Sequence, residues 1–138
     1  MNENVKNRLK IEIKKAYYTS KRYAQETTFA ILHHDKELEI DILGKMVRVS
    51  DLLIKIDENH YFIFFKFTNQ TQAFKASENV LLELDNYFNT TNSCIGLDAF
   101  DINKSPTIVI NRLMQILNEV KKNKFLRIED ENILNDMV

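Results

Sequence analysis

The sequence predicts a mixed α/β fold in a single domain, with several strands and helices alternating along the chain. The first observation is the stretch 48–67, where apolar residues recur at every second position on both sides of a polar turn at residues 57–59. The second is the three- and four-residue spacing of apolar side chains in residues 4–22 and 71–88, which is typical of amphipathic helices. Together these patterns predict helices packed on a sheet.

The stretch 48–67 is predicted to form a β-hairpin at the centre of the sheet. Its second strand is aromatic or aliphatic at every position from 61 to 65, so it is apolar on both faces. Such a strand is expected in the interior of a covered sheet, not at an edge. We therefore expect the hairpin to be central, and its turn is the natural place to look for chemistry.

Residues 4–22 are predicted to form a leading amphipathic helix whose apolar stripe packs on the sheet. Val5 and Leu9 at its start could equally pair with a second copy of the chain. A β-branched and apolar segment at residues 27–34 predicts the first strand. Apolar residues at helical spacing within 36–47 predict a short helix before the hairpin.

A further helix is predicted after the hairpin at about residues 71–88, with Thr71 or Thr68 available as its N-cap. A strand follows at residues 93–100, and it is interrupted by Gly96. Without the leading helix, the order of elements up to this strand is β-α-β-β-α-β. That order is the ferredoxin-like core.

The C-terminal part predicts one more helix and one more strand. Ser105 and Pro106 mark the start of the helix, because a hydroxyl caps it and proline is tolerated at the first helical position. A short last strand is predicted at residues 125–128, before an acidic segment at 129–131 that is expected to fray. We expect one domain over residues 1–138, with its core at about 9–128, because this length suits a single hydrophobic core.

Composition argues against several functional classes. Nineteen basic and twenty acidic residues give a net charge of −1 with no long run of either sign, which favours neither a nucleic acid nor a membrane as partner. Cys94 is the only cysteine, so neither a disulfide framework nor a thiolate metal cluster is expected. No apolar run approaches the ~20 residues that span a bilayer. We expect a cytoplasmic protein without a cofactor.

The hairpin resembles the core of the GGDEF domains, the diguanylate cyclases that join two GTP molecules into cyclic di-GMP. The shared order is an aspartate, three residues, a basic and an aliphatic residue, a five-residue turn and a long apolar strand. The resemblance extends over most of the chain and implies a ferredoxin-like core of the nucleotidyl cyclase type. Further matching positions are Cys94-Ile95-Gly96 for a Ser-Ile-Gly strand, Lys121 for a lysine of the last helix, and Arg127-Ile128 for a closing basic-aliphatic pair.

The sequence of the turn differs from that of the family at the positions where the resemblance implies catalysis. The family reads Gly-Gly-Asp-Glu-Phe there, and its two glycines let the backbone approach GTP. The metal-binding acids of the family correspond here to His33 on the first strand and to the turn, and neutral imidazole or amide groups are poor ligands for Mg²⁺. We therefore expect no enzymatic activity, and a solvated Lys121. The five turn residues of this chain are Asp57, Glu58, Asn59, His60 and Tyr61.

Two features could still form a binding site. Arg48 and Asp51 stand where the family has an Arg-x-x-Asp motif that binds cyclic di-GMP, although a surface arginine beside a strand-initiating aspartate is the simpler interpretation. His33 and His60, with Asp35 or Glu58, could bind a transition metal such as Zn²⁺, although strand-end histidines are more often only hydrogen-bonded. Because His33 and His34 are adjacent on a strand, they should point to opposite faces.

These observations predict a GGDEF-like domain that has lost its active site and acts as a non-catalytic signalling, dimerisation or protein-interaction module. Its partner would be a second copy or another signalling protein. The alternative is a receptor for cyclic di-GMP through Arg48 and Asp51. Residual diguanylate cyclase activity is the least favoured hypothesis.

Overall fold

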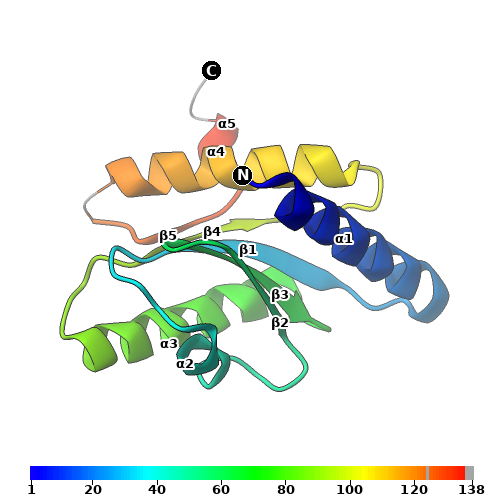
Figure 1. The fold of residues 1–138 in the computed structure, drawn as a ribbon. Helices are drawn as coiled ribbons and strands as arrows, with labels where there is room; N and C mark the ends of the chain where they lie inside the picture. The colour runs from blue at the N-terminus through cyan, green and yellow to red at the C-terminus, as the bar shows by residue number, and fades with distance from the viewer. Residues whose placement is uncertain (124, 136–138) are drawn as a thin grey trace.

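The computed structural model describes residues 1–123 and 125–135, which form one five-stranded sheet covered by helices on both faces (Figure 1). Helices α1 and α4 lie on one face, and α2 and α3 lie on the other. The helices are α1 (Glu3–Tyr23), α2 (Ile40–Gly44), α3 (Gln70–Phe88), α4 (Pro106–Lys122) and α5 (Asn132–Asn135). The strands are β1 (Thr27–His33), β2 (Leu52–Asp57), β3 (His60–Lys66), β4 (Cys94–Asp98) and β5 (Ile128–Glu129).

The strand order is β2-β3-β1-β4-β5. Strand β3 pairs antiparallel with both β2 and β1, β1 pairs antiparallel with β4, and β5 adds to β4 in parallel. The first four strands with α2 and α3 make the β-α-β-β-α-β ferredoxin-like core, so the predicted fold class is confirmed. The described parts of the chain contain no helix that combines the length and apolar character needed to cross a membrane.

Strand β3 is the interior strand that its sequence predicted, but β2 lies at the edge of the sheet, so the prediction that the whole hairpin is central is wrong. Every residue from 61 to 65 is buried, because alternate side chains enter the two cores on either side of the sheet. The core under α1 and α4 includes Phe29 and Phe62, and the core under α3 includes Leu32 and Ile63. The sheet is thus the shared wall of two hydrophobic cores.

Helix α1 uses Leu9 for packing, so the prediction that Leu9 could pair with a second copy is wrong. Leu9 and Ile13 are completely buried against the sheet, and Val5 packs at the margin of the same core. On the same face, α4 approaches β4 closely at Gly96. A Cβ at Gly96 would lie only 3.0 Å from Ile116 Cγ2, so glycine permits this approach.

Helix boundaries follow capping chemistry. Helix α4 begins as predicted, because Ser105 Oγ accepts a hydrogen bond from the Ile108 N–H and Pro106 occupies the first turn. Helix α3 is capped by Asn69, not by Thr71 or Thr68. Asn69 Oδ1 accepts from the Gln72 N–H at 2.9 Å, and Gln72 Oε1 accepts from the Asn69 N–H at 3.1 Å. This reciprocal capping box satisfies two N–H groups, which a single threonine cap does not.

The C-terminal segment is more ordered than its composition suggested. The last strand is only Ile128–Glu129, shifted from the predicted 125–128, and Phe125 and Leu126 are exposed instead of paired. The prediction that 129–131 frays is wrong. Glu129 belongs to β5, and Glu131 accepts a hydrogen bond from Gln70 Nε2 at 2.7 Å.

Candidate functional site

The turn between β2 and β3 is tighter than the five-residue turn expected from the sequence. Only Glu58 and Asn59 lie outside the strands, and Asp57 pairs with His60 across the end of the hairpin. Among the described non-glycine residues, positive φ angles occur at Ala24, Phe67 and Asn89, and none of these lies in the turn. This backbone therefore needs no glycine, and side chains occupy all of its positions.

Asn59 fastens the turn to the end of β1. Its Nδ2 donates to the carbonyl oxygens of His34 and Asp35 at 2.9 and 3.0 Å, and its own carbonyl accepts from the His34 N–H at 2.9 Å. The Asn59 N–H in turn donates to Asp57 Oδ1 at 2.9 Å. The side-chain NH2 group and the backbone carbonyl of Asn59 thus hold the turn and the end of β1 together.

His60 joins the turn to the last turn of α4. Its Nδ1 lies 2.7 Å from Asp57 Oδ1, and its Nε2 lies 2.9 Å from Lys121 Nζ. Because an ammonium group can only donate, Nε2 must accept, and the proton of the neutral ring is then on Nδ1 and donated to Asp57. The expectation that Lys121 is merely solvated is therefore wrong.

The surroundings of Asp57 and His33 shift the pKa values of both groups. Burial acts to raise the pKa of Asp57, but hydrogen bonds from the Asn59 N–H and from His60 outweigh it, so the pKa lies below its usual value. The pKa of His33 is lowered from 6.5 by burial and by the nearby Lys121 and His60, against an opposing effect of Asp35. At neutral pH the site therefore holds the Asp57 carboxylate and a neutral His33.

His33 lies beside His60 because the two residues are paired across β1 and β3. Their ring centroids are 5.0 Å apart, and His33 Nε2 lies 3.5 Å from Asp35 Oδ1. His34 points to the opposite face, as predicted. It is fully buried, with Nδ1 2.6 Å from Ser93 Oγ and its ring against Phe88.

The geometry does not support the predicted metal site of His33, Asp35 and His60. Both ring nitrogens of His60 are occupied by Asp57 and Lys121. Across residues 1–123 and 125–135, no group of three or more His, Cys, Asp or Glu side chains is arranged to hold a metal ion. The three residues are neighbours, but their contacts are hydrogen bonds and ring packing.

A polar cavity of about 460 Å³ opens beside His33 and Lys121. Residues 91–94 and Arg127 complete much of its lining. Its two basic side chains already have partners, since Lys121 contacts His60 and Arg127 forms two hydrogen bonds with Asp85 at 2.8 and 2.7 Å. The cavity is therefore polar and bordered by basic side chains that already contact other parts of the chain.

Arg48 and Asp51 contact each other at the other end of β2. The Asp51 side chain is only 1% exposed, and its Oδ1 accepts from Arg48 Nη2 at 2.9 Å and from the Lys66 N–H at 3.2 Å. Its Oδ2 accepts from the Arg48 N–H and Nε at 3.0 and 3.3 Å. Arg48 Nη2 also donates to the Lys66 carbonyl at 2.6 Å. The Asp51 carboxylate is saturated, and the pair anchors the loop before β2 to the end of β3.

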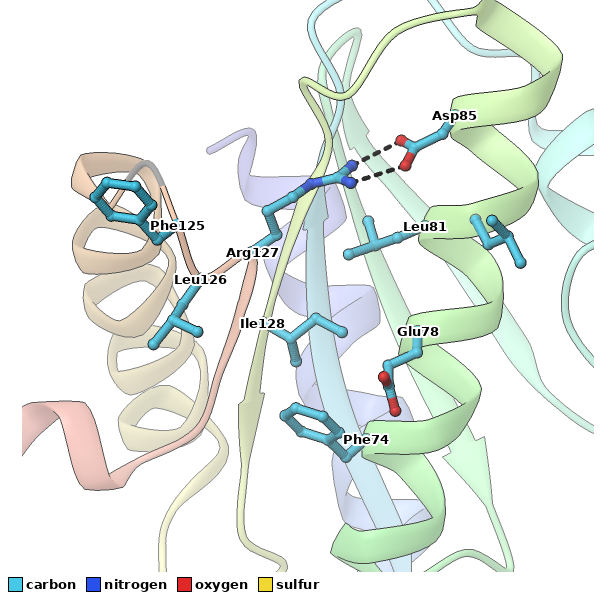
Figure 2. Close-up of a pocket in the computed structure, with 9 residues that line it drawn as sticks. Phe74, Glu78, Leu81, Asp85, Phe125, Leu126, Arg127 and Ile128 are labelled. Carbon is cyan, nitrogen blue, oxygen red and sulfur yellow. Dashed lines mark hydrogen bonds and ion pairs between the residues drawn. The ribbon is translucent and has the colours of Figure 1, made fainter.

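The contact between α3 and the segment 125–128 was not predicted. Figure 2 shows Phe74 and Leu81 on α3 facing Leu126 and Ile128 across a groove of about 290 Å³. The ion pair between Arg127 and Asp85 closes one end of this groove. Arg127 also donates to the Ser93 carbonyl at 2.9 Å, so the pair fixes the segment before β5 onto α3.

Comparisons with known proteins identify the fold. No model of a known protein family matches the chain. No curated protein matches it either.

Solved structures do match. The GGDEF domain of DgcB from Caulobacter crescentus, in complex with c-di-GMP, is 11% identical with a TM-score of 0.71, covering 88% of this chain and 86% of that one. The diguanylate cyclase SiaD from Pseudomonas aeruginosa, in complex with its activator SiaC, is 13% identical with a TM-score of 0.72, covering 91% of this chain and 57% of that one.

A third match is LapD from Vibrio cholerae, a segment with an S helix, a GGDEF and an EAL part bound to c-di-GMP. It is 14% identical with a TM-score of 0.65, covering 88% of this chain and 34% of that one. At such low identity these matches concern the fold, and activity has to be argued from the site. The chain thus has the fold of the GGDEF domains of diguanylate cyclases.

Proposed function

We propose that this GGDEF-fold chain is a signalling or protein-interaction module that acts by binding and not by turnover of GTP. The observation that carries the proposal is the 2.9 Å contact between Lys121 and His60. By the family resemblance, Lys121 would face a phosphate. Here it donates to an imidazole that is itself held by Asp57, so this lysine is engaged with the turn of the hairpin.

The histidines at the metal-binding positions support the same proposal. The first-strand position is His33, whose pKa is lowered by burial, and the turn positions are Asn59 and His60. Catalysis of phosphoryl transfer by two metal ions needs hard oxygen ligands that clamp Mg²⁺. Imidazole and amide groups at these positions suit that role poorly, and the acids that remain in the turn, Asp57 and Glu58, precede the two turn positions in the sequence.

The direct test is incubation of the purified chain with GTP and Mg²⁺ or Mn²⁺, followed by chromatography of the nucleotides. We expect no cyclic di-GMP above the level of a protein-free control. An active diguanylate cyclase in parallel shows that the assay would detect product. Product formation that is lost in Lys121→Ala would refute the proposal, because it would show that Lys121 serves the nucleotide.

A receptor for cyclic di-GMP through Arg48 and Asp51 is the second candidate. Its support is that the Arg48 side chain is 52% exposed beside a cavity of about 380 Å³, where its Nη1 forms no hydrogen bond with another described residue. The dinucleotide would have to be recognised by the Nη1 side of the Arg48 guanidinium alone. The carboxylate of Asp51 already accepts four hydrogen bonds. A ligand contact by Asp51 would require the loop before β2 to rearrange.

Calorimetric titration with cyclic di-GMP separates the two candidates. The non-catalytic module without a nucleotide site gives no heat. A receptor gives a saturable signal that is lost in Arg48→Ala and kept in Arg8→Ala, a matched change on the exposed surface of α1. Equal binding by all three proteins would show that Arg48 is not the site.

A further inference from the structure

Helix α1 carries a charge that the composition of the whole chain conceals. It contains seven basic and only two acidic residues, whereas the rest of the chain contains twelve basic and eighteen acidic residues. The net charge of −1 is therefore the sum of a strongly basic helix and an acidic remainder. Such segregation gives α1 a local positive potential.

The surface of α1 that faces solvent combines these charges with two large apolar side chains. Ile11 is 55% exposed and Tyr18 is 61% exposed. Because they are seven residues apart, they lie on the same face of the helix, opposite the buried Leu9 and Ile13. We call this face the outer stripe of α1, defined by Arg8, Ile11, Lys14, Lys15, Tyr18 and Arg22.

Most of the basic charge on the outer stripe is not neutralised within the chain. Lys15 lies 3.3 Å from Glu12, an exposed pair that contributes little. Arg22 donates to the Tyr18 hydroxyl at 2.8 Å and keeps its charge. Arg8 and Lys14 form no ion pair with any residue that the structure describes. An acidic surface that complements these cations would have to come from another molecule.

A second copy that pairs symmetrically through its own α1 is a poor occupant of the outer stripe. Pairing two α1 helices through Ile11 and Tyr18 would bring Arg8, Lys14 and Lys15 toward the same residues of the other copy, and like charges at flanking positions disfavour helix pairing. A lipid surface is also a poor occupant, because the broad apolar face that would enter it is already buried in the core. Two apolar residues at heptad spacing instead match the contact surface of a helix.

We propose that the outer stripe of α1 docks an acidic amphipathic helix of a different protein. Ile11 and Tyr18 pack against its apolar positions, and Arg8, Lys14 and Lys15 pair with its flanking carboxylates. The inference deepens the proposed function, on which it rests for the premise that the domain acts through a partner. Opposite charges across the contact speed association and make it depend on salt.

The test uses a labelled helical peptide of about four heptads with leucine at the a and d positions and glutamate at e and g, and a matched peptide with lysine at e and g. Fluorescence anisotropy measures binding to the full chain at low and high salt. We expect saturable, salt-sensitive binding of the acidic peptide only. The double variant Ile11→Gln/Tyr18→Gln should weaken it by about tenfold or more.

Charge-reversal variants define the surface. Arg8→Glu/Lys14→Glu should weaken binding by at least about tenfold, whereas Lys75→Glu, an exposed change on α3, should alter it by less than about twofold. Circular dichroism shows whether each variant keeps the fold. No binding of the acidic peptide, or binding that persists unchanged in Ile11→Gln/Tyr18→Gln, would overturn the inference.

Other ligands are tested in parallel with the same variants. Equally tight binding to anionic phospholipid vesicles or to duplex DNA that is lost in Arg8→Glu/Lys14→Glu would overturn the inference in favour of a membrane or a nucleic acid. Self-association at high concentration that is abolished by Ile11→Gln/Tyr18→Gln would overturn it in favour of a second copy. Turnover of GTP would refute only the proposed function, because it does not involve the outer stripe.

Discussion

Two aspartates flank β2, and each contacts a basic or imidazole side chain three residues away in sequence. Asp51 precedes the strand and pairs with Arg48, whereas Asp57 ends the strand and pairs with His60. Their side chains differ in exposure, at 1% for Asp51 and 57% for Asp57. A similar local pairing therefore forms a buried anchor at one end of β2 and an accessible contact at the other.

The difference shows that the stabilising effect of each aspartate depends on how many donors its carboxylate accepts from and on their burial, more than on whether it forms an ion pair. Asp51 has both oxygens saturated by backbone and side-chain donors, so losing it leaves donors of Arg48 and Lys66 without an acceptor. Asp57 accepts from Asn59 and His60 next to water, which can replace either donor. The Arg48 end is thus suited to stability, and the turn end can exchange partners.

The largest expected effect is on the stability of Asp51→Ala. Removing this carboxylate should lower the free energy of unfolding by about 3 kcal/mol, because it leaves partly buried donors unsatisfied. Asp57→Ala should lower it by less than about 1 kcal/mol, since that side chain is exposed. Urea denaturation followed by circular dichroism measures both, and equal losses would show that exposure does not distinguish the two ends.

A smaller effect is expected on the pH dependence of stability. Burial lowers the pKa of both His34 and His33 in the folded chain below the unfolded value of 6.5. In acid the unfolded state therefore binds protons that the folded state does not. The contribution of these two histidines to the free energy of unfolding is complete above pH 6.5 and is lost as pH falls below it.

His34 should account for more of this loss, because it is fully buried and its Nε2 has no hydrogen-bond partner among the described residues. Urea midpoints measured between about pH 5 and 8 should fall less steeply with acid in His34→Gln than in the wild type. His33→Gln, at a partly exposed position, is the matched control. A wild-type midpoint that does not change over this range would contradict the prediction.

The smallest effect concerns the proton on His60. The neutral ring should carry it on Nδ1, because Lys121 donates to Nε2. Long-range proton–nitrogen NMR distinguishes the two tautomers directly. In Lys121→Met, which removes the donor and keeps much of the side-chain volume, the Nε2–H form should gain population. An Nε2–H tautomer in the wild type would show that Lys121 and His60 are not hydrogen-bonded in solution.

Local patterns predicted most of the fold. The double-sided apolar pattern of β3 and the Ser105-Pro106 start of α4 depend on neighbours in sequence, and both are confirmed. The cap of α3 was missed although its signal was present, because Asn69 and Gln72 have the spacing of a capping box. The short β5 could not be placed from its sequence, since its position depends on pairing with β4.

The candidate site was less predictable because its contacts join distant parts of the chain. His33 and His60 were expected to be close, and the pairing of β1 with β3 brings them together. The bond from Lys121 to His60 spans sixty-one positions and requires the docking of α4 on the sheet. Likewise, Asp85 and Arg127 meet only because the segment before β5 packs beside α3.

The placement of β3 also bears on the behaviour of this chain at high concentration. Residues 61–65 form a continuous aromatic and aliphatic run, the kind of segment that stacks into fibrils when it is exposed. In the native sheet this run is flanked by β1 on one side and by β2 on the other. The border strand β2 therefore shields the most aggregation-prone part of the protein, so damage to the anchor at Asp51 would be expected to promote precipitation as well as unfolding.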